Sequence, residues 1–348
     1  GISIKAKELF KEAFKSGSGK INLFTLFIEQ SFRLLKNAGK FSFIIPNTFL
    51  RVTSYNESRK LLIQNHKVYN IYDFGNSVFE DAITTAVVII ASKETADNNH
   101  KISINNNGVL NSIKQGEIAD SNYVIALNID PERRTLIEKL KKSAIDLGSI
   151  SDELIFGVVI TLNKEEVVSD IPKPGWKPFL EGRDIGAYYI KPIHSYLNYS
   201  PNLLHRPRTK KIFEAPEKLI IQRITGGNQP LKVAYDNNKY YNKESINNII
   251  LKEDSLYNAK YVLGLLNSKL LNWFYTNQFT NESKLTVNLS KEYLSQIPIY
   301  KATKDEQENI VSIVEKILEL KENDFNKDTS VLERKIDLLV CQLYGLTE

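Results

Sequence analysis

The chain has 348 residues, 42% of them hydrophobic and 25% charged, a composition that excludes disordered and fibrous proteins and predicts two or three compact units. No apolar run reaches the roughly 18 residues of a membrane span and no signal peptide is recognisable, so we expect a cytoplasmic protein. One cysteine, Cys341, and four histidines without metal-ligand spacing argue against disulfides and a structural zinc site, and the net charge of +5 alone indicates no particular partner.

The first predicted elements lie between residues 20 and 93, where helical and strand patterns alternate. Apolar residues recur at helical spacing from Phe24 to Leu35, and Gly39 follows where a helix C-cap glycine belongs. The next elements are a strand, a polar helix and two more strands, at Phe41–Ile45, Tyr55–Asn65, Val68–Phe74 and Thr85–Ala91. The alternation predicts an α/β layer with a largely parallel sheet. The last two strands should pair antiparallel, because the connection between them is too short for a crossover helix.

The pattern changes in the rest of the chain. A stretch rich in Asn and Ser, residues 94–128, precedes a charged helix at Pro131–Lys142. Irregular strands, turns and aromatic residues then predict an α+β domain that contains one strong helix at Asn258–Tyr275. Amphipathic helices at Lys304–Glu322 and Thr329–Tyr344 predict a helical hairpin. The expected domains are residues 1–97, a connecting subdomain at 98–146, the α+β domain at 147–303 and the hairpin at 304–348.

Positive charge is concentrated in one short segment. Residues 205–211 carry four fixed positive charges in seven positions, and Arg183 and Arg223 lie in other polar loops. Such a run is either a solvated basic loop or a contact surface for a polyanion, and composition does not decide between the two.

Several common catalytic and cofactor motifs are missing. The segment Ser16–Lys20 resembles the end of a phosphate-binding loop, but Ile21 stands where Ser or Thr is required and Phe14 where the first glycine belongs, so we reject a nucleoside triphosphate site. No glycine-rich dinucleotide fingerprint follows a predicted strand. Ser, His and acidic residues are too scattered to predict a hydrolase triad.

The order in which certain sequence segments follow one another along the chain is informative. It begins with the helix, strands and loop of Gly19–Lys93, which include Phe41–Leu50 and Val78–Ala82. Four more segments follow: Lys177–Ile185, Lys218–Gly226, Leu263–Leu271 and Ile297–Ile299. In this order the chain resembles the later part of the adenine-N6 DNA methyltransferases of restriction–modification systems, including type IIG-like enzymes that fuse nuclease, methyltransferase and specificity domains.

The resemblance implies a fold and indicates which functional parts lie within this chain. It implies the C-terminal half of a Rossmann-like methyltransferase sheet, followed by an α+β target-recognition domain and the helical hairpin. The family's catalytic Asn-Pro-Pro-Tyr motif and its S-adenosyl-methionine motif are absent from the chain. We therefore expect both to lie upstream of Gly1, no catalytic residue in this chain, and no activity of the chain alone. Mg²⁺ is expected only if a nuclease domain is attached, and the expected partner is double-stranded DNA.

One candidate residue belongs to the methyltransferase half. A base must leave the duplex before its exocyclic amine can be methylated, and a flat side chain then holds it. Phe79 lies between the last two predicted strands, and by resemblance it matches the family's aromatic residue that packs against the flipped adenine. The alternative is that Phe79 caps the core of the sheet.

The other candidates lie in the α+β domain. Arginine and amide side chains can read base edges, and the loop around Gly226 and Gly227 offers Gln222, Arg223, Asn228 and Gln229 for this role. Fixed positive charges more naturally contact phosphates, and the candidates for DNA contacts of this kind are Arg183, Arg206, Arg208, Lys210 and Lys211. A plain glycine hairpin is the alternative for the first group.

Two other functions are compatible with parts of the pattern. A stand-alone DNA specificity subunit would explain the α+β domain, but it predicts no methyltransferase sheet, so the three strands between Phe41 and Ala91 argue against it. An RNA or protein methyltransferase with an accessory domain would explain the sheet. Dependence of binding on DNA sequence at fixed salt concentration separates that class from a site-specific DNA enzyme.

Overall fold

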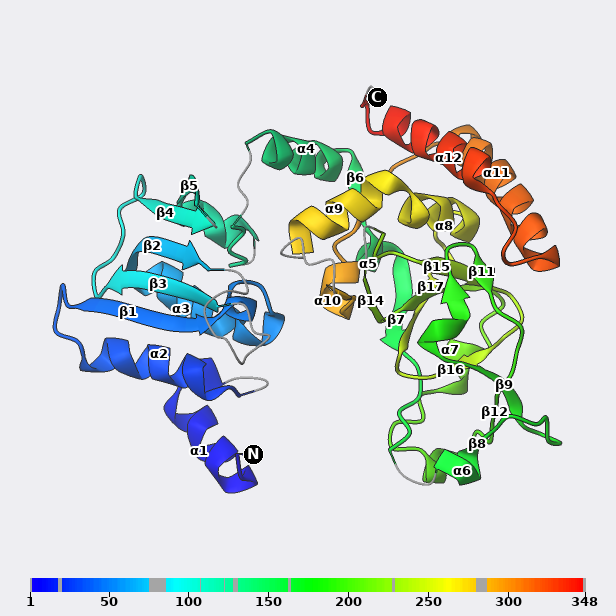
Figure 1. Cartoon of the computed structure of the whole chain (residues 1–348), viewed down its shortest axis with the longest axis horizontal. Helices are drawn as coiled ribbons and strands as arrows, with labels where there is room; N and C mark the ends of the chain where they lie inside the picture. Colours follow the sequence, from blue (N-terminus) through cyan, green and yellow to red (C-terminus); the bar gives the residue numbers. More distant parts are fainter. Residues whose placement is uncertain are drawn as a thin grey trace. The chain divides into compact units, whose positions relative to one another are not determined.

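The computed structural model describes residues 2–17, 21–74, 86–106, 108–121, 123–127, 131–161, 164–226, 229–279 and 287–346. The chain divides into two compact units, unit 1 at Gly1–Arg134 and unit 2 at Thr135–Glu348, and both combine helices with strands (Figure 1). The fold is therefore mixed α/β.

Unit 1 is built on one five-stranded sheet. In spatial order its strands are β1 (Lys40–Pro46), β3 (Ala86–Ser92), β2 (Lys67–Asp73), β4 (Lys101–Asn106) and β5 (Val109–Lys114). The three strands expected from the sequence are thus present, each shifted by about one residue. The last two of them, β2 and β3, pair antiparallel as predicted.

The expectation of a largely parallel sheet was wrong for the described strands. Strand β3 lies between β1 and β2 and runs antiparallel to both, and β4 pairs antiparallel with β5. Only the β2–β4 pair is parallel. The residues expected to form a connecting subdomain supply β4 and β5, which complete this sheet. The cause is the short return from β2 to β3, which inserts an antiparallel strand between two parallel ones.

The helices of unit 1 are α1 (Ile4–Ala13), α2 (Leu23–Leu34) and α3 (Asn56–Asn65). Helix α2 begins after Asn22, whose side-chain oxygen accepts a hydrogen bond from the backbone N–H of Phe24. Its buried Ile28 and Phe32 join Leu62 of α3 and Ile89 of β3 in one hydrophobic cluster. The packing of both helices on the sheet therefore stabilises this unit.

Unit 2 contains several small sheets. The principal sheet has the order β15 (Val233–Asp236), β13 (Lys218–Gln222), β17 (Ile246–Leu251) and β7 (Ser151–Phe156). A second has the order β16 (Tyr241–Asn242), β9 (Lys177–Leu180), β12 (Tyr196–Leu197) and β8 (Val168–Ser169). The remaining pairs are β10 (Ile185–Gly186) with β11 (Tyr189–Ile190), β14 (Ile224–Thr225) with β18 (Val287–Asn288), and β6 (Ala144–Asp146) with β19 (Pro298–Tyr300).

The longer helices of unit 2 are α8 (Ala259–Asn267), α9 (Lys269–Phe279), α11 (Lys304–Asn323) and α12 (Ser330–Leu343), and α4 (Pro131–Lys142) spans the boundary between the units. Single-turn helices complete the chain at α5 (Leu147–Ile150), α6 (Lys164–Val167), α7 (Lys210–Phe213) and α10 (Lys291–Leu294). The single helix expected at Asn258–Tyr275 was wrong, because the chain breaks at Ser268, whose hydroxyl donates to the carbonyl of Leu265 at 2.6 Å.

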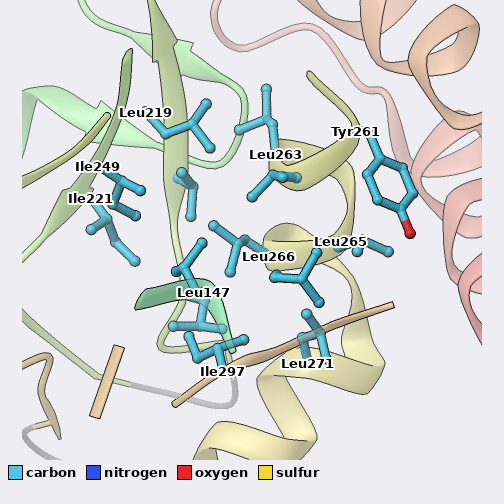
Figure 2. Close-up of a cluster of buried hydrophobic side chains, with 14 of the residues drawn as sticks. Leu147, Leu219, Ile221, Ile249, Tyr261, Leu263, Leu265, Leu266, Leu271 and Ile297 are labelled. Carbon is cyan, nitrogen blue, oxygen red and sulfur yellow. The ribbon is translucent and has the colours of Figure 1, made fainter. Parts of the chain in front are cut away.

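The main core of unit 2 lies between the principal sheet and the helices. Figure 2 shows Leu219, Ile221 and Ile249 of the sheet facing Leu263 and Leu266 of α8, all of them buried. Residues of α11 and α12 belong to the same cluster. The leucine-rich stripe of α8 and α9 is therefore part of the hydrophobic core.

Candidate nucleic-acid interface

The candidate interface begins at one end of the principal sheet of unit 2. Strands β7 and β13 both pair antiparallel with β17, so their carboxyl ends lie at the same end of the sheet. Phe156 is the last residue of β7 and is paired with Asn247, and Gln222 is the last residue of β13 and is paired with Ile246. The residue that follows β13, Arg223, therefore emerges at the same end of the sheet as Phe156, with β17 between their strands.

Two arginines lie on the ring of Phe156. The guanidinium carbon of Arg208 is 4.0 Å from the ring centroid, and that of Arg223 is 4.6 Å from it. The Nε of Arg208 donates to the carbonyl of Phe156 at 3.0 Å. The backbone N–H of Arg223 donates to the carbonyl of Ser245 at 2.8 Å. Main-chain contacts thus hold both arginines beside the ring.

Arg206 completes a cluster of three positive charges. Its backbone pairs with Val159, three residues after Phe156, through an isolated β-bridge. Burial lowers the pKa of Arg208, and the neighbouring charges of Arg206 and Arg223 lower it further, while Glu153 opposes the shift. Among the described residues none of the three arginines forms an ion pair with an acidic side chain. The cluster therefore gathers three positive charges at the end of the sheet, with Glu153 opposing them only partly.

The two lysines of the basic run lie on the short helix α7. Lys211 is exposed and forms an ion pair with Asp152 of β7, with an Nζ–Oδ2 distance of 2.9 Å. This hydrogen bond raises the pKa of Lys211. Lys210 is exposed. Ion pairs at such exposed positions stabilise little, so both lysines remain available to a polyanion.

Gln222 is hydrogen-bonded to the turn that carries Arg183. The side-chain amide of Gln222 donates to the carbonyls of Gly182 and Ile185, at 2.7 Å each, and so fixes the 3-10 turn η5 (Gly182–Asp184) to β13. The Arg183 side chain is 71% exposed and lies 3.3 Å from Glu181. In this structure the Gln222 amide nitrogen is occupied within the protein, whereas the Arg183 guanidinium reaches solvent.

Three candidate residues remain, of which the structure describes one. Gln229 is exposed, whereas Asn228 and Phe79 lie outside the described residues. The structure thus brings together Arg206, Arg208 and Arg223, ties Lys211 of α7 to Asp152 on the strand that ends at Phe156, and positions Arg183 on a separate turn.

Phe156 is the site residue that sequence reasoning missed. The one local signal is the glycine that follows it: a Cβ atom at Gly157 would lie 2.0 Å from the backbone oxygen of Asn242, so only glycine fits between these two segments. That signal marks a close backbone approach rather than an aromatic platform.

The described parts of the chain lack both a metal-binding cluster and a membrane-spanning helix. They hold no group of three or more His, Cys, Asp or Glu side chains that could bind a metal ion. Nor is any helix within them long and apolar enough to cross a bilayer.

Two protein families match separate parts of the chain. Residues 2–79 match the Eco57I restriction-modification methylase, and residues 177–299 match the TaqI-like C-terminal specificity domain. These matches confirm the expected resemblance to restriction–modification methyltransferases with a target-recognition domain. Arg183, Arg206, Arg208 and Arg223 all lie inside the second match.

Curated relatives are of the same kind. The chain is 26% identical over 361 residues to the putative type II restriction enzyme and methyltransferase RM.MjaORFECS2P of Methanocaldococcus jannaschii, in an alignment that covers 99% of this chain and 30% of the relative. It is 33% identical over 91 residues to the type II methyltransferase M.AccI of Acinetobacter calcoaceticus. That alignment covers 26% of this chain and 16% of the relative. The chain thus spans less than a third of the length of these relatives.

Solved structures share the fold. The type IIL restriction-modification enzyme MmeI, solved in complex with DNA, superposes with a TM-score of 0.62 at 12% identity, over 96% of this chain and 51% of that chain. The type ISP restriction-modification enzyme LlaBIII, bound to DNA, superposes with a TM-score of 0.54 at 12% identity, over 94% of this chain and 29% of that chain. At these identities the likeness concerns the fold alone.

Proposed function

We propose that unit 2 recognises a short sequence in duplex DNA, and that the chain is the DNA-recognition part of a site-specific adenine-N6 methyltransferase of a restriction–modification system. The observation that carries the proposal is the arginine cluster at the end of the principal sheet, which lies largely within the segment that matches a specificity domain. Phosphate contacts supply much of the affinity of such interfaces, and clustered arginines without an ion-pair partner can provide them.

Base readout is assigned to the loop that follows β14. Gln229 is exposed there, and a glutamine amide can pair with adenine in the major groove. Asn228 is proposed for the same role from its place in the sequence. Arg183, Lys210 and Lys211 are proposed to contact phosphates, since all three are exposed and carry fixed charge.

Unit 1 is proposed to be the C-terminal half of a Rossmann-like methyltransferase sheet. Support comes from its match to a methylase over residues 2–79. By resemblance, Phe79 would stack on the flipped adenine. A stand-alone specificity subunit explains unit 2 equally well but leaves this sheet without a role.

The described residues of unit 1 do not fit S-adenosyl-methionine. Strand β1 runs into Pro46 and the 3-10 helix η2 (Asn47–Leu50), where Asn47, Phe49 and Leu50 are buried and occupy the space at the strand end. The Asn47 amide donates to Asp73 at 2.6 Å. A nucleoside cofactor in this fold class needs a glycine turn that admits it to the backbone, and the described end of β1 provides none.

Selection from a pool of random duplexes tests the proposal. The chain is expected to enrich one short sequence, and Gln229→Ala should relax the preference at one base pair by roughly 1–3 kcal/mol. Lys210→Ala should instead weaken binding to all sequences alike. Retrieval of no preferred sequence, or tighter binding to RNA duplexes than to DNA, would contradict the assignment.

A further inference from the structure

Two arginine side chains in unit 2 lie against the same aromatic ring. Arg208 and Arg223 lie on Phe156, with guanidinium carbons 4.0 and 4.6 Å from its centroid. A cation is attracted to the face of an aromatic ring within about 6 Å of the centroid. The two cations nevertheless repel one another, and Arg206 adds to the repulsion: burial lowers the pKa of Arg208 most, and the charges of Arg206 and Arg223 lower it further. The ring therefore holds charges together that would otherwise separate.

The donors of these arginines are only partly used. Arg208 donates from Nε to the carbonyls of Phe156 and Gly157, at 3.0 and 3.5 Å, and Arg223 makes one long contact of 3.4 Å from Nη1 to the carbonyl of Glu244. No other side-chain hydrogen bond of these two residues occurs among the described residues. Several N–H groups of the two guanidinium groups thus remain for a ligand.

We propose that Phe156 is a positioning residue that holds Arg208 and Arg223, with Arg206 beside them, as a binding site for phosphate groups of the DNA backbone. The proposal rests on the function proposed for unit 2. It moves Arg223 from base readout, the role expected from the sequence, to sequence-independent contact.

Electrostatics favours a phosphate over a base as the ligand. A base edge is neutral, so it leaves the repulsion among three guanidinium groups in place. A phosphodiester is an anion with oxygen acceptors that suit guanidinium donors, and it reduces the repulsion as it binds. The cluster thus gains most from an anion.

The first experiment measures affinity of the full chain for a duplex of arbitrary sequence over a range of salt concentrations. Arg208→Gln and Arg223→Gln are each expected to weaken binding about tenfold or more and to reduce the slope of log K against log salt by about 0.9, the value of one phosphate contact. The control is Arg334→Gln on α12, an exposed arginine with the same change in charge, which should leave the slope unchanged.

The second experiment tests the ring itself. Replacement of Phe156 by mono-, di- and pentafluorinated phenylalanine removes the negative face of the ring with little change in shape, so DNA affinity should fall stepwise while the melting temperature stays nearly constant. Phe156→Tyr should retain affinity and Phe156→Leu should lose it. A purely structural role of Phe156 would give the same affinity for all the fluorinated rings.

The outcomes separate the two proposals. If the wild-type chain binds no duplex DNA at any salt concentration, the proposed function of unit 2 fails. If the wild type binds with a steep salt dependence but the Arg208 and Arg223 variants behave like Arg334→Gln, only the phosphate site fails. If Arg223→Gln loses affinity for one selected sequence and not for arbitrary DNA, Arg223 returns to base readout and the inference is overturned.

Discussion

Arg208 combines an unusual backbone conformation with a side chain that we propose contacts DNA phosphates. Its φ is +66°, in the left-handed region that non-glycine residues seldom adopt. The hydroxyl of Tyr199 donates to its carbonyl, and its own Nε donates to Phe156, so contacts on both sides maintain the conformation. Strain of this kind accumulates at functional sites, because the surrounding structure must over-determine it. The strained backbone places the guanidinium on the Phe156 ring.

A comparison of two truncations isolates this strain. Arg208→Ala and Arg208→Gly both remove the guanidinium, but only glycine tolerates a positive φ. We expect the glycine variant to be more stable than the alanine variant by about 1 kcal/mol, which corresponds to roughly 2–4 °C in the melting temperature of unit 2. Both variants should lose DNA affinity to the same extent.

The exposed Lys335 in α12 provides the control for this pair of truncations. There the order should reverse, with alanine more stable than glycine by up to about 1 kcal/mol, because glycine disfavours a helix interior. Thermal unfolding of the four variants measures the difference in stability between alanine and glycine at each position. Equal stability of the two Arg208 variants would show that the backbone at this position is unstrained.

At the scale of elements, the packing of α8 against α11 depends on one glycine. A Cβ atom at Gly264 would lie 2.6 Å from Cγ2 of Ile310 and 3.1 Å from Cγ2 of Val314, so the two helices approach too closely for any side chain. Ile310 is fully buried. Gly264 therefore lets α11 pack onto the leucine-rich helix that covers the principal sheet.

Gly264→Ala is expected to destabilise unit 2, although alanine is the better helix former. The gain in helix propensity is about 1 kcal/mol, whereas overpacking a tight core costs about 1–3 kcal/mol, so the net change should be destabilising. Ile310→Ala alone should cost about 2–5 kcal/mol. The double variant should be more stable than the sum of the two single changes predicts, because the new methyl group enters the space that Ile310 vacates.

Gly116→Ala serves as the matched control, since a Cβ atom there would meet no atom within 4 Å. Its effect on the melting temperature should be close to zero or slightly stabilising. Additive losses for Gly264→Ala and Ile310→Ala would show that the two residues do not contact one another.

The break between α8 and α9 shows why one helix was expected where two exist. The apolar spacing from Leu263 to Leu271 continues through the break, so periodicity alone predicts one helix. The helix ends at Ser268, and the preceding Asn267 is fixed to the sheet, since its side chain accepts from the N–H of Val233 at 2.9 Å and donates to the carbonyl of Val233 at 3.0 Å. These hydrogen bonds pair the backbone N–H and carbonyl of Val233 in β15. The contact joins residues 34 positions apart, so the local sequence does not reveal it.

For the whole molecule, sequence patterns located the elements better than their arrangement. The strands of unit 1 were expected nearly where they lie, because short apolar runs bounded by turns are local signals. The insertion of β3 between β1 and β2 depends on long-range pairing and was not foreseen. The same holds for the interface: the basic run indicated Arg206 and Arg208, but the Phe156 carbonyl that holds Arg208 lies 52 residues away in sequence.

The two units should also differ in what they bind. Duplex DNA should bind to unit 2, with affinity falling at least about tenfold between roughly 50 and 200 mM salt as phosphate contacts release counterions. S-adenosyl-methionine should give no heat of binding with the chain, because the described end of β1 is occupied by the buried Asn47, Phe49 and Leu50 and offers no glycine turn. Calorimetric titration with the cofactor, beside DNA titrations at both salt concentrations, tests the two halves of the prediction. Micromolar binding of the cofactor would mean that unit 1 contains a nucleoside site, and salt-independent DNA binding would remove the arginine cluster from the interface.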